Sequence, residues 1–295
     1  MKTDRLNHAL GHHLELISRE DALLWRYDYG SRPKPFFHPL CTPRGFCLSL
    51  FEPSDHVWHR GLWFAIKFVN GENFWEENDE YGRQVTPVPP LVEHYEDGSF
   101  SWLSHLHWER PAGAGVILKE TRRITYRALS ETSYALDWDI SLHAEEDVFL
   151  DRTPFTTWGG YGGLTMRGNR NWVQTRLLFP YGRTDERPKG LPATWCDFAG
   201  TFDGGANCSG GIALLDHPQN VRHPSPWYGA TGSGHYVNAA FLFHEPMRLE
   251  RKTDLTLRYR ALVHDEMWEA AQLRQMYQNW LQLPGQPSSL EGQQI

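Results

Sequence analysis

A run of alternating side chains near the middle of the sequence constrains the fold most strongly. Over residues 134–142, large apolar side chains alternate with small or polar ones; the apolar ones are Tyr134, Leu136, Trp138, Ile140 and Leu142. Successive side chains of a β-strand point to opposite faces, so this pattern predicts a strand with one buried face. Similar apolar runs predict further strands at 62–68, 101–108, 115–127, 210–215, 239–243 and 255–263.

The composition agrees with an all-β chain. The 295 residues include 15 Phe, 12 Tyr and 13 Trp, together with 26 Gly and 19 Pro. Aromatic residues favour strands, and glycine and proline favour the turns between them. We therefore expect a single β domain over residues 1–283, with two smaller β-sandwich domains as the alternative. A polar tail over residues 284–295 is expected to be flexible.

Only the C-terminal region has the pattern of a helix. Leu273, Met276, Tyr277 and Trp280 recur at helical spacing, and Asp265 is a candidate N-cap. An apolar stripe of this kind predicts a helix that packs against the β domain.

Charge and cysteine content exclude several classes of protein. The formal net charge is −7, with 29 basic and 36 acidic residues, and there is no long basic run, so a nucleic-acid partner is not expected. No apolar run approaches the roughly 20 residues of a membrane helix, and the N-terminus lacks the apolar core of a signal peptide. The four cysteines form no Cys-x-x-Cys pair. We expect reduced thiols and a soluble cytoplasmic protein.

The stretch 55–75 combines histidine, arginine and tryptophan at high density. His56, His59 and Arg60 lie in a predicted turn at 55–61, which leads into the strand at 62–68. Asn70-Gly71 then predicts a hairpin turn, because these residues tolerate the positive φ angles of a tight turn. The acidic run over 76–80 is interpreted as a solvated loop.

Three further histidine clusters follow predicted strands. They are His217-Pro218-Gln219-Asn220, the segment from His223 to Trp227, and His244-Glu245-Pro246. The glycine-rich segment 158–167 fits equally a tight β corner or the rim of a ligand site. Loops at strand ends often carry function, so these clusters are candidates for one common site.

Several ordered motifs carry a family resemblance through nearly the whole chain. They are His56-x-x-His59-Arg60-Gly61-Leu62-Trp63-Phe64, Val69-Asn70-Gly71-x-x-Phe74-Trp75, Trp195-x-Asp197-Phe198-x-Gly200, His217-Pro218-x-Asn220 with Pro226-Trp227, and Phe243-His244-Glu245-Pro246. These motifs resemble a bacterial family labelled methane-oxygenase PmoA-like (DUF6807-type), a family of unknown function. One segment departs from the family pattern, since Tyr228-Gly229-Ala230 stands where an Arg-Tyr-Gly-like segment is usual.

The resemblance implies both a fold and a general role in carbohydrate metabolism. Members of the family look like companions of sugar-catabolic dehydrogenases, and their expected shape is similar to the galactose-mutarotase supersandwich. The implied fold is an all-β antiparallel supersandwich, with two large sheets face to face and a C-terminal helix against one side. Subunits of particulate methane oxygenase are membrane proteins, so the methane-oxygenase label is not used as a guide to function.

The leading hypothesis is a carbohydrate-active enzyme that acts on a sugar or keto-sugar as a mutarotase, epimerase or lyase. The expected catalytic set is His59, His217, Glu245 and Arg60, in which a histidine donates a proton and Glu245 accepts one. Trp63, Trp75, Trp195 and Trp227 would pack on sugar faces. The other substrate-binding candidates are His38, His56, Asn70, Asp197, Asn220 and His223.

Two alternatives stay open at this point. A metal-dependent enzyme would draw its ligands from the histidines and Glu245, whereas a non-catalytic sugar-binding module would need only the tryptophans. No other cofactor is expected. The hypothesis makes one geometric prediction, that His59, His217 and Glu245 face one cleft, with Trp227 or Trp63 as a wall and Glu245 buried beside it.

Overall fold

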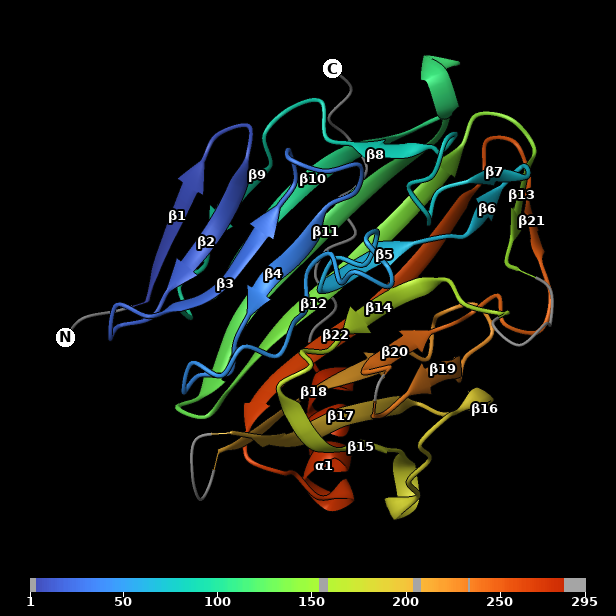
Figure 1. The fold of residues 1–295 in the computed structure, drawn as a ribbon. Helices are drawn as coiled ribbons and strands as arrows, with labels where there is room; N and C mark the ends of the chain where they lie inside the picture. The colour runs from blue at the N-terminus through green and yellow to red at the C-terminus, as the bar shows by residue number, and fades with distance from the viewer. Residues whose placement is uncertain (1–3, 154–158, 204–207, 233, 284–295) are drawn as a thin grey trace.

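Two large antiparallel sheets form the body of the molecule in a computed structural model that describes residues 4–153, 159–203, 208–232 and 234–283 (Figure 1). The first sheet has nine strands in the order β1-β2-β3-β4-β5-β14-β20-β19-β16. Its strands are β1 (Arg5–Ala9), β2 (His13–Ile17), β3 (Leu23–Asp28), β4 (Phe36–Leu40), β5 (Leu62–Ala65), β14 (Gly163–Arg167), β20 (Tyr236–Ala239), β19 (Pro226–Ala230) and β16 (Lys189–Pro192).

The second sheet packs against the first and also has nine strands. Its order is β15-β17-β18-β22-β12-β11-β10-β8, and β9 pairs with β10 beside this path. Its strands are β15 (Trp172–Leu178), β17 (Trp195–Phe202), β18 (Ser209–Asp216), β22 (Asp254–Asp265), β12 (Ser133–Ala144), β11 (Val116–Ser130), β10 (Phe100–Glu109), β8 (Arg83–Val85) and β9 (Leu91–His94).

A small four-stranded sheet stands at one end of the sandwich. It joins β21 (Met247–Leu249), β13 (Val148–Asp151), β6 (Phe68–Val69) and β7 (Glu72–Asn73) in that order. The β6–β7 hairpin turns at Asn70 and Gly71, which have φ angles of 50° and 80°. The predicted hairpin turn is confirmed, since both residues adopt the positive φ that the turn requires.

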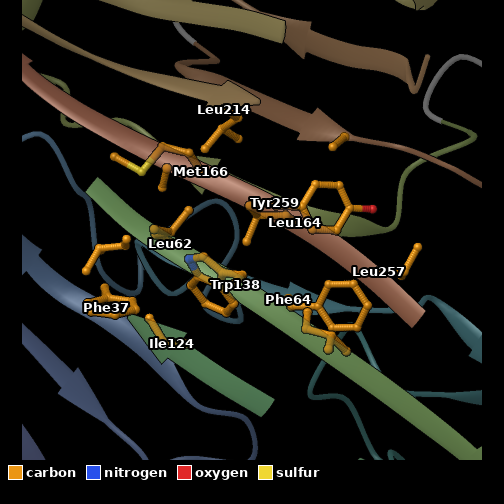
Figure 2. Packing of buried hydrophobic residues seen from close by; sticks show 14 of the residues in the cluster. Phe37, Leu62, Phe64, Ile124, Trp138, Leu164, Met166, Leu214, Leu257 and Tyr259 are labelled. Carbon is orange, nitrogen blue, oxygen red and sulfur yellow. The ribbon is translucent and has the colours of Figure 1, made fainter. Parts of the chain in front are cut away.

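Apolar side chains from the two sheets meet in one large cluster between them (Figure 2). On the first sheet, Phe37, Leu62 and Phe64 point into this cluster, and on the second sheet Trp138 and Tyr259 do so. The cluster joins side chains from both halves of the chain, from Leu14 to Val263. This packing accounts for the alternation that the sequence shows along β12.

The helix α1 (Ala270–Leu281) covers the outer face of the second sheet. Leu273, Tyr277 and Trp280 are buried against Trp195 and Leu215. The predicted apolar stripe is confirmed, but the predicted cap is wrong. Glu269 caps the helix through a reciprocal capping box with Gln272, whereas Asp265 is the last residue of β22.

The predicted fold class is confirmed, because the structure is nearly all antiparallel sheet with a single C-terminal helix among its described residues. One predicted strand is misplaced. The sequence predicted a strand at 239–243, but β20 ends at Ala239 and the chain then turns, with Phe243 N donating to Ala240 O at 2.8 Å. Residues 240–243 are all buried, so their apolar run reflects a packed turn. The expected flexible tail at 284–295 lies outside the described residues. In the described part of the chain, no helix is long and apolar enough to cross a membrane.

Candidate functional site

The outer face of the first sheet carries a second aromatic cluster, separate from the core. Alternation along β5 sends Leu62 and Phe64 into the sandwich and Trp63 to the opposite side. The same alternation on neighbouring strands brings further rings to this face. We call the set the outer aromatic cluster, with buried members Phe36, Trp63, Trp75 and Tyr236 and partly buried members Phe51, Trp58, Tyr161 and Tyr228.

His59 lies inside the outer aromatic cluster. Its ring centroid is 5.1 Å from that of Trp63 and 5.5 Å from that of Tyr236, onto which it stacks. The His56 ring stacks on the His59 ring at 4.7 Å, and the Trp75 ring approaches the His59 ring edge-on at 6.3 Å. The side chain is only 5% exposed. The loop that links Phe51 to β5 therefore delivers a buried imidazole to an aromatic surface.

Arg167, the last residue of β14, fixes the state of the His59 ring. Its Nη1 lies 3.4 Å from His59 Nδ1, and a guanidinium can only donate. Burial lowers the pKa of His59 well below 6.5, and the positive charge of Arg167 lowers it further. The ring is therefore neutral near pH 7, with Nδ1 as acceptor and the proton on Nε2.

Asp55 links this ring to the surface. Its carboxylate accepts hydrogen bonds from Arg167 Nη2 at 3.0 Å and from Arg170 Nη2 at 2.6 Å. Partial burial would raise the pKa of Asp55, but Arg167 and His56 outweigh burial and lower it to about 2. Asp55 also lines an open cleft of about 830 Å³, together with Arg170, Trp172, Val173, Gln174, Thr175, Glu186, Thr231, Gly232 and His235.

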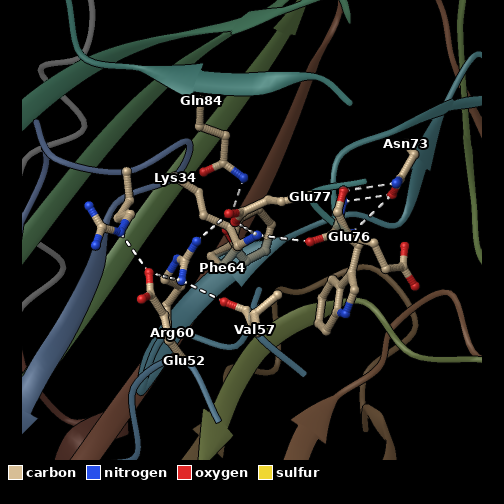
Figure 3. Close-up of polar contacts among 11 residues, drawn as sticks. Lys34, Glu52, Val57, Arg60, Phe64, Asn73, Glu76, Glu77 and Gln84 are labelled. Atoms are coloured by element: carbon tan, nitrogen blue, oxygen red, sulfur yellow. Dashed lines mark hydrogen bonds and ion pairs between the residues drawn. The ribbon is translucent and has the colours of Figure 1, made fainter. Parts of the chain in front are cut away.

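Arg60 and Lys34 belong to a buried polar network beside the loop that links Phe51 to β5 (Figure 3). Arg60 donates to Glu52 Oε1 and to the Val57 carbonyl, both at 2.7 Å, and it forms an ion pair with Glu77. Lys34 donates to Glu77 Oε1 at 2.9 Å, and burial lowers the pKa of Lys34 to about 8. Arg60 thus anchors the loop that carries His59, which gives it a positioning role in the structure.

Lys67, Glu76 and Tyr161 form a second polar group across Trp75 from His59. Lys67 is paired with Glu76, and the Tyr161 hydroxyl donates to Glu76 Oε1 at 3.0 Å. The Tyr161 ring lies 5.2 Å from the Trp75 ring. Burial lowers the pKa of Lys67 to about 8, and repulsion by Lys34 acts in the same direction. The acidic run at 76–80 was interpreted as a solvated loop, but Glu76 and Glu77 are only 14% and 13% exposed and belong to these networks.

A comparison with known protein families shows which family this chain belongs to. The model of DUF6807, described as a family of unknown function, matches residues 16–278. The chain belongs to the DUF6807 family. The match gives no support to the methane-oxygenase label, and no curated protein matches the sequence.

Two solved structures illustrate how distant the structural relatives are. A galactose mutarotase related enzyme from Lactobacillus acidophilus has 11% identity and a TM-score of 0.35, and the alignment covers 90% of this chain and 99% of that one. A proposed aldose 1-epimerase from Klebsiella pneumoniae has 11% identity and a TM-score of 0.40, with 90% and 80% covered. At these scores the likeness carries no argument about the site of this DUF6807 chain.

The structure brings some of the predicted site residues together and places the others elsewhere. His56, His59, Arg60, Trp63 and Trp75 meet on the outer face of the first sheet. His38 lies at the border of this group, since its ring stacks on Phe51 at 5.3 Å and its Nδ1 lies 2.8 Å from Ser49 Oγ. Burial lowers the pKa of His38 to about 4.

His217 lies on the opposite side of the sandwich, which contradicts the predicted shared cleft. Along β18, Leu214 points into the core and Leu215 points to the helix side. His217 continues on the side of Leu215, and its ring meets that of Trp280 at 5.3 Å. Two sheets separate it from His59, so the pairing of these histidines was wrong.

Glu245 is exposed, not buried. Its carboxylate is 71% exposed and forms an ion pair with Arg222 at 3.2 Å. The predicted burial beside an aromatic wall is therefore wrong, because the strand expected to present Glu245 is a turn. Trp227 is also misplaced: it packs in the core between the sheets, and its Nε1 donates to Ala193 O at 2.8 Å. Its neighbour Tyr228 reaches the outer aromatic cluster instead.

The remaining polar candidates hold the backbone in place. Asn70 accepts from Phe149 N at 2.7 Å and ties the β6–β7 hairpin to β13. Asn220 donates to Asp216 Oδ1 at 2.7 Å and accepts from Arg258 N at 2.6 Å. His223 binds the same aspartate, with Nδ1 2.7 Å from Asp216 Oδ2. These contacts make the proposed sugar anchors parts of the scaffold.

Asp197 and Trp195 belong to the face under α1. Asp197 Oδ1 lies 2.9 Å from His264 Nε2, and both side chains are fully buried. Trp195 packs in the cluster with α1. Neither residue is near His59. Among the described residues, no three His, Cys, Asp or Glu side chains are grouped to hold a metal ion, so the set proposed for the metal alternative is not assembled.

Sequence reasoning did not name Arg167, Lys34, Lys67, Tyr161 and Tyr236 as site residues, although Tyr161 and Arg167 lie in the glycine-rich segment that it weighed equally as a β corner and as a ligand rim. Arg167 and Tyr236 sit at strand positions whose neighbours Met166 and Val237 point into the core, so alternation along β14 and β20 places them outward. That signal was available for Arg167 within the glycine-rich segment. The lysines had no such signal, because nothing in their local sequence distinguishes a buried lysine from a solvated one.

Proposed function

We propose that the outer aromatic cluster binds a carbohydrate and that His59 donates a hydrogen bond from Nε2 to an oxygen of that ligand. One observation carries the proposal: a neutral imidazole is buried among aromatic rings and held at Nδ1 by Arg167. A histidine in this state is a fixed hydrogen-bond donor at Nε2, which can polarise a carbonyl or ring oxygen without giving up its proton.

The aromatic rings suit the apolar face of a sugar. Trp58, Tyr161 and Tyr228 are partly exposed at the border of the cluster, where a ring could be covered by a ligand. Trp63 Nε1 is buried and has no hydrogen-bond partner among the described residues. Buried donors normally have partners, so an oxygen of a bound ligand or an ordered water would satisfy it.

Acid–base catalysis also needs a group that exchanges a proton near neutral pH. Lys67 is the candidate, because burial lowers its pKa to about 8 and it lies beside Tyr161, 5.9 Å from that ring. Lys34 has a similar pKa but donates to Glu77 and to the Trp75 carbonyl. Lys67 and Glu76 therefore replace His217 and Glu245 in the proposed mechanism. A mutarotase, epimerase or lyase reaction remains the proposed class.

The test uses a panel of monosaccharides and keto-sugars with two matched variants. Calorimetric titration and tryptophan fluorescence would measure affinity for wild type, His59→Asn and His217→Asn. We expect His59→Asn to weaken binding by about tenfold or more, the value of one buried hydrogen bond, and His217→Asn to change it less than twofold. Equal losses in the two variants, or no binding by the wild type, would refute the site.

Turnover separates an enzyme from a binding module. Proton NMR in D₂O would follow anomer exchange and deuterium uptake beside the carbonyl of any sugar that binds. We expect wild type to accelerate one of these and Lys67→Met to slow it while sugar affinity changes little. A sugar that binds tightly and is left unchanged would favour the non-catalytic binding module.

A further inference from the structure

Cys41 and Cys47 face each other across a tight antiparallel hairpin at the end of β4. They form an isolated antiparallel bridge pair, and both thiols are free. Thr42 N donates to Phe46 O at 2.9 Å, and Leu48 N donates to Leu40 O at 2.8 Å. These two bonds flank the cysteine pair on either side, so the cysteines occupy a non-hydrogen-bonded pair position.

That position has the right dimensions for a disulfide. Opposed residues of a non-hydrogen-bonded pair have Cα atoms about 4.5 Å apart and side chains on the same face. Disulfides span Cα separations of roughly 4.4–6.8 Å. Leu40 and Leu48, the next pair, point into the core, so Cys41 and Cys47 both point to the outer face of the first sheet. The two thiols are close enough that each shifts the pKa of the other.

Hydrogen bonds from other parts of the chain hold both strands of this hairpin while the cysteines are still reduced. The Tyr134 hydroxyl donates to the Cys41 carbonyl at 2.7 Å, and Asn169 Nδ2 donates to the Cys47 carbonyl at 3.3 Å. Gly45 N closes the turn on Thr42 O at 2.8 Å. Little backbone movement is therefore needed to join the two sulfur atoms.

We propose that Cys41 and Cys47 are a site of reversible oxidation, at which a small-molecule disulfide such as oxidised glutathione converts the two thiols to an intramolecular disulfide. The Cys47 thiolate attacks one sulfur of the reagent, forms a mixed disulfide and releases one thiolate. The Cys41 thiolate then attacks the Cys47 sulfur and releases the second thiolate. Two cysteine thiols and one disulfide reagent thus yield one protein disulfide and two small thiols.

The order of the two steps follows from the surroundings of each thiol. Cys47 is half-buried and Cys41 is 6% exposed, so the reagent reaches Cys47 first. Pairing with Cys41 lowers the pKa of Cys47, and contacts with Ser49 lower it further, while the same pairing raises the pKa of Cys41. Cys47 is the attacking thiol and Cys41 the resolving one.

The hairpin leads directly into the backbone that supports His59. Leu50 N donates to Arg167 O at 3.0 Å, and Glu52 N donates to His59 O at 3.0 Å. Cys47 lies three residues before the first of these bonds. A disulfide at the start of this segment would restrain both residues that define the neutral imidazole. The oxidation site itself does not depend on the proposed function.

Peptide mapping tests the proposal without any variant. Arg44 lies between the two cysteines, so trypsin places Cys41 in the peptide 27–44 and Cys47 in the peptide 45–60. Native protein would be incubated with excess oxidised glutathione or with dithiothreitol, alkylated, digested without reduction and analysed by mass spectrometry. We expect a linked pair of these peptides only after oxidation, and a fall from four free thiols to two. Both peptides alkylated after oxidation, or Cys47 left as a stable glutathione adduct, would overturn it.

Two variants sharpen the result. Cys208→Ser should form the same linkage, whereas Cys41→Ser should leave Cys47 as the mixed disulfide. Hydrogen exchange of the amides of Leu50 and Glu52 should slow severalfold on oxidation of the wild type and not of Cys41→Ser. If Cys41→Ser does not fold, the peptide map of the wild type still decides. A linkage that involves Cys208 would contradict the proposal.

Discussion

The two outer faces of the sandwich both bury histidines beside tryptophans, yet they hold them in different ways. Under α1, His264 has acceptors at both nitrogens, with Asp197 Oδ1 2.9 Å from Nε2 and the Glu266 carbonyl 3.2 Å from Nδ1. On the first sheet, His59 Nδ1 meets a donor, the Arg167 guanidinium, at 3.4 Å. Burial alone therefore does not distinguish the two rings. His264 meets acceptors at both nitrogens, whereas His59 meets a donor at Nδ1, which leaves Nε2 as the donor in the proposed site.

The covering of the two faces differs as well. The helix α1 buries Trp195 and packs Trp268 near its start, and His264 stacks on Trp268 at 4.4 Å. On the first sheet, Trp58, Tyr161 and Tyr228 remain partly exposed around His59. On the second sheet, the aromatic surface is covered by α1 and packs against it. On the first sheet, part of the aromatic surface stays exposed, and the proposed site uses this surface.

The largest expected effect is on stability, at the face under α1. Asp197→Ala leaves His264 without its carboxylate in a fully buried site, so we expect a loss of about 3–5 kcal/mol in the free energy of unfolding. Asp254→Ala is the matched control, because Asp254 is 58% exposed and pairs with His143, and it should cost less than about 1 kcal/mol. Urea denaturation measures both. Equal losses would remove the structural distinction drawn for His264.

The second prediction concerns pH and the first sheet. His59 has a folded pKa well below 6.5, so below pH 6.5 the unfolded chain binds more protons and stability falls as pH falls. One such group contributes a slope of up to about 1.4 kcal/mol per pH unit. His59→Asn should remove most of this contribution. His217→Asn should remove less. Burial also lowers the pKa of His217, but this ring is only half-buried. Unfolding midpoints at pH 7 and pH 5.5 give the comparison, and a steeper slope in His59→Asn would contradict it.

The smallest expected effect is at Glu245, which sequence analysis placed in the catalytic set. The side chain is 71% exposed and its one ion pair, with Arg222, is at the surface. Glu245→Gln should change the free energy of unfolding by less than about 0.5 kcal/mol and leave ligand affinity unchanged. A loss of turnover in this variant, with stability intact, would restore Glu245 to the site and displace Lys67.

Strand positions could be predicted because alternation records which side chains face the core. The pattern at 134–142 predicted β12, and Asn70-Gly71 predicted the turn of the β6–β7 hairpin. The assembly of the site could not be predicted in the same way. Along β18 both faces are buried, so the sequence does not distinguish the face under α1 from the core, and His217 was assigned to the wrong side.

The same limit explains the error at Glu245 and the omission of Lys67. Residues 240–243 are apolar because a turn packs them, and an apolar run of that length is also typical of a buried strand. A lysine buried beside a carboxylate has no local sequence signature. By contrast, His56, His59, Trp63 and Trp75 lie within 20 residues of one another in the sequence, so the short segment from the loop before β5 to just beyond the β6–β7 hairpin brings them together.

The protonation state of the His59 ring tests the central claim most directly. Nitrogen-15 NMR of histidine side chains, assigned by the loss of one ring signal in His59→Asn, reports which nitrogen carries the proton. We predict a neutral ring at pH 7 with the proton on Nε2 and an unprotonated Nδ1, and a ring that stays neutral to well below pH 6.5. A charged imidazolium at pH 7, or a neutral ring protonated at Nδ1, would contradict the account of Arg167 and the proposed donor.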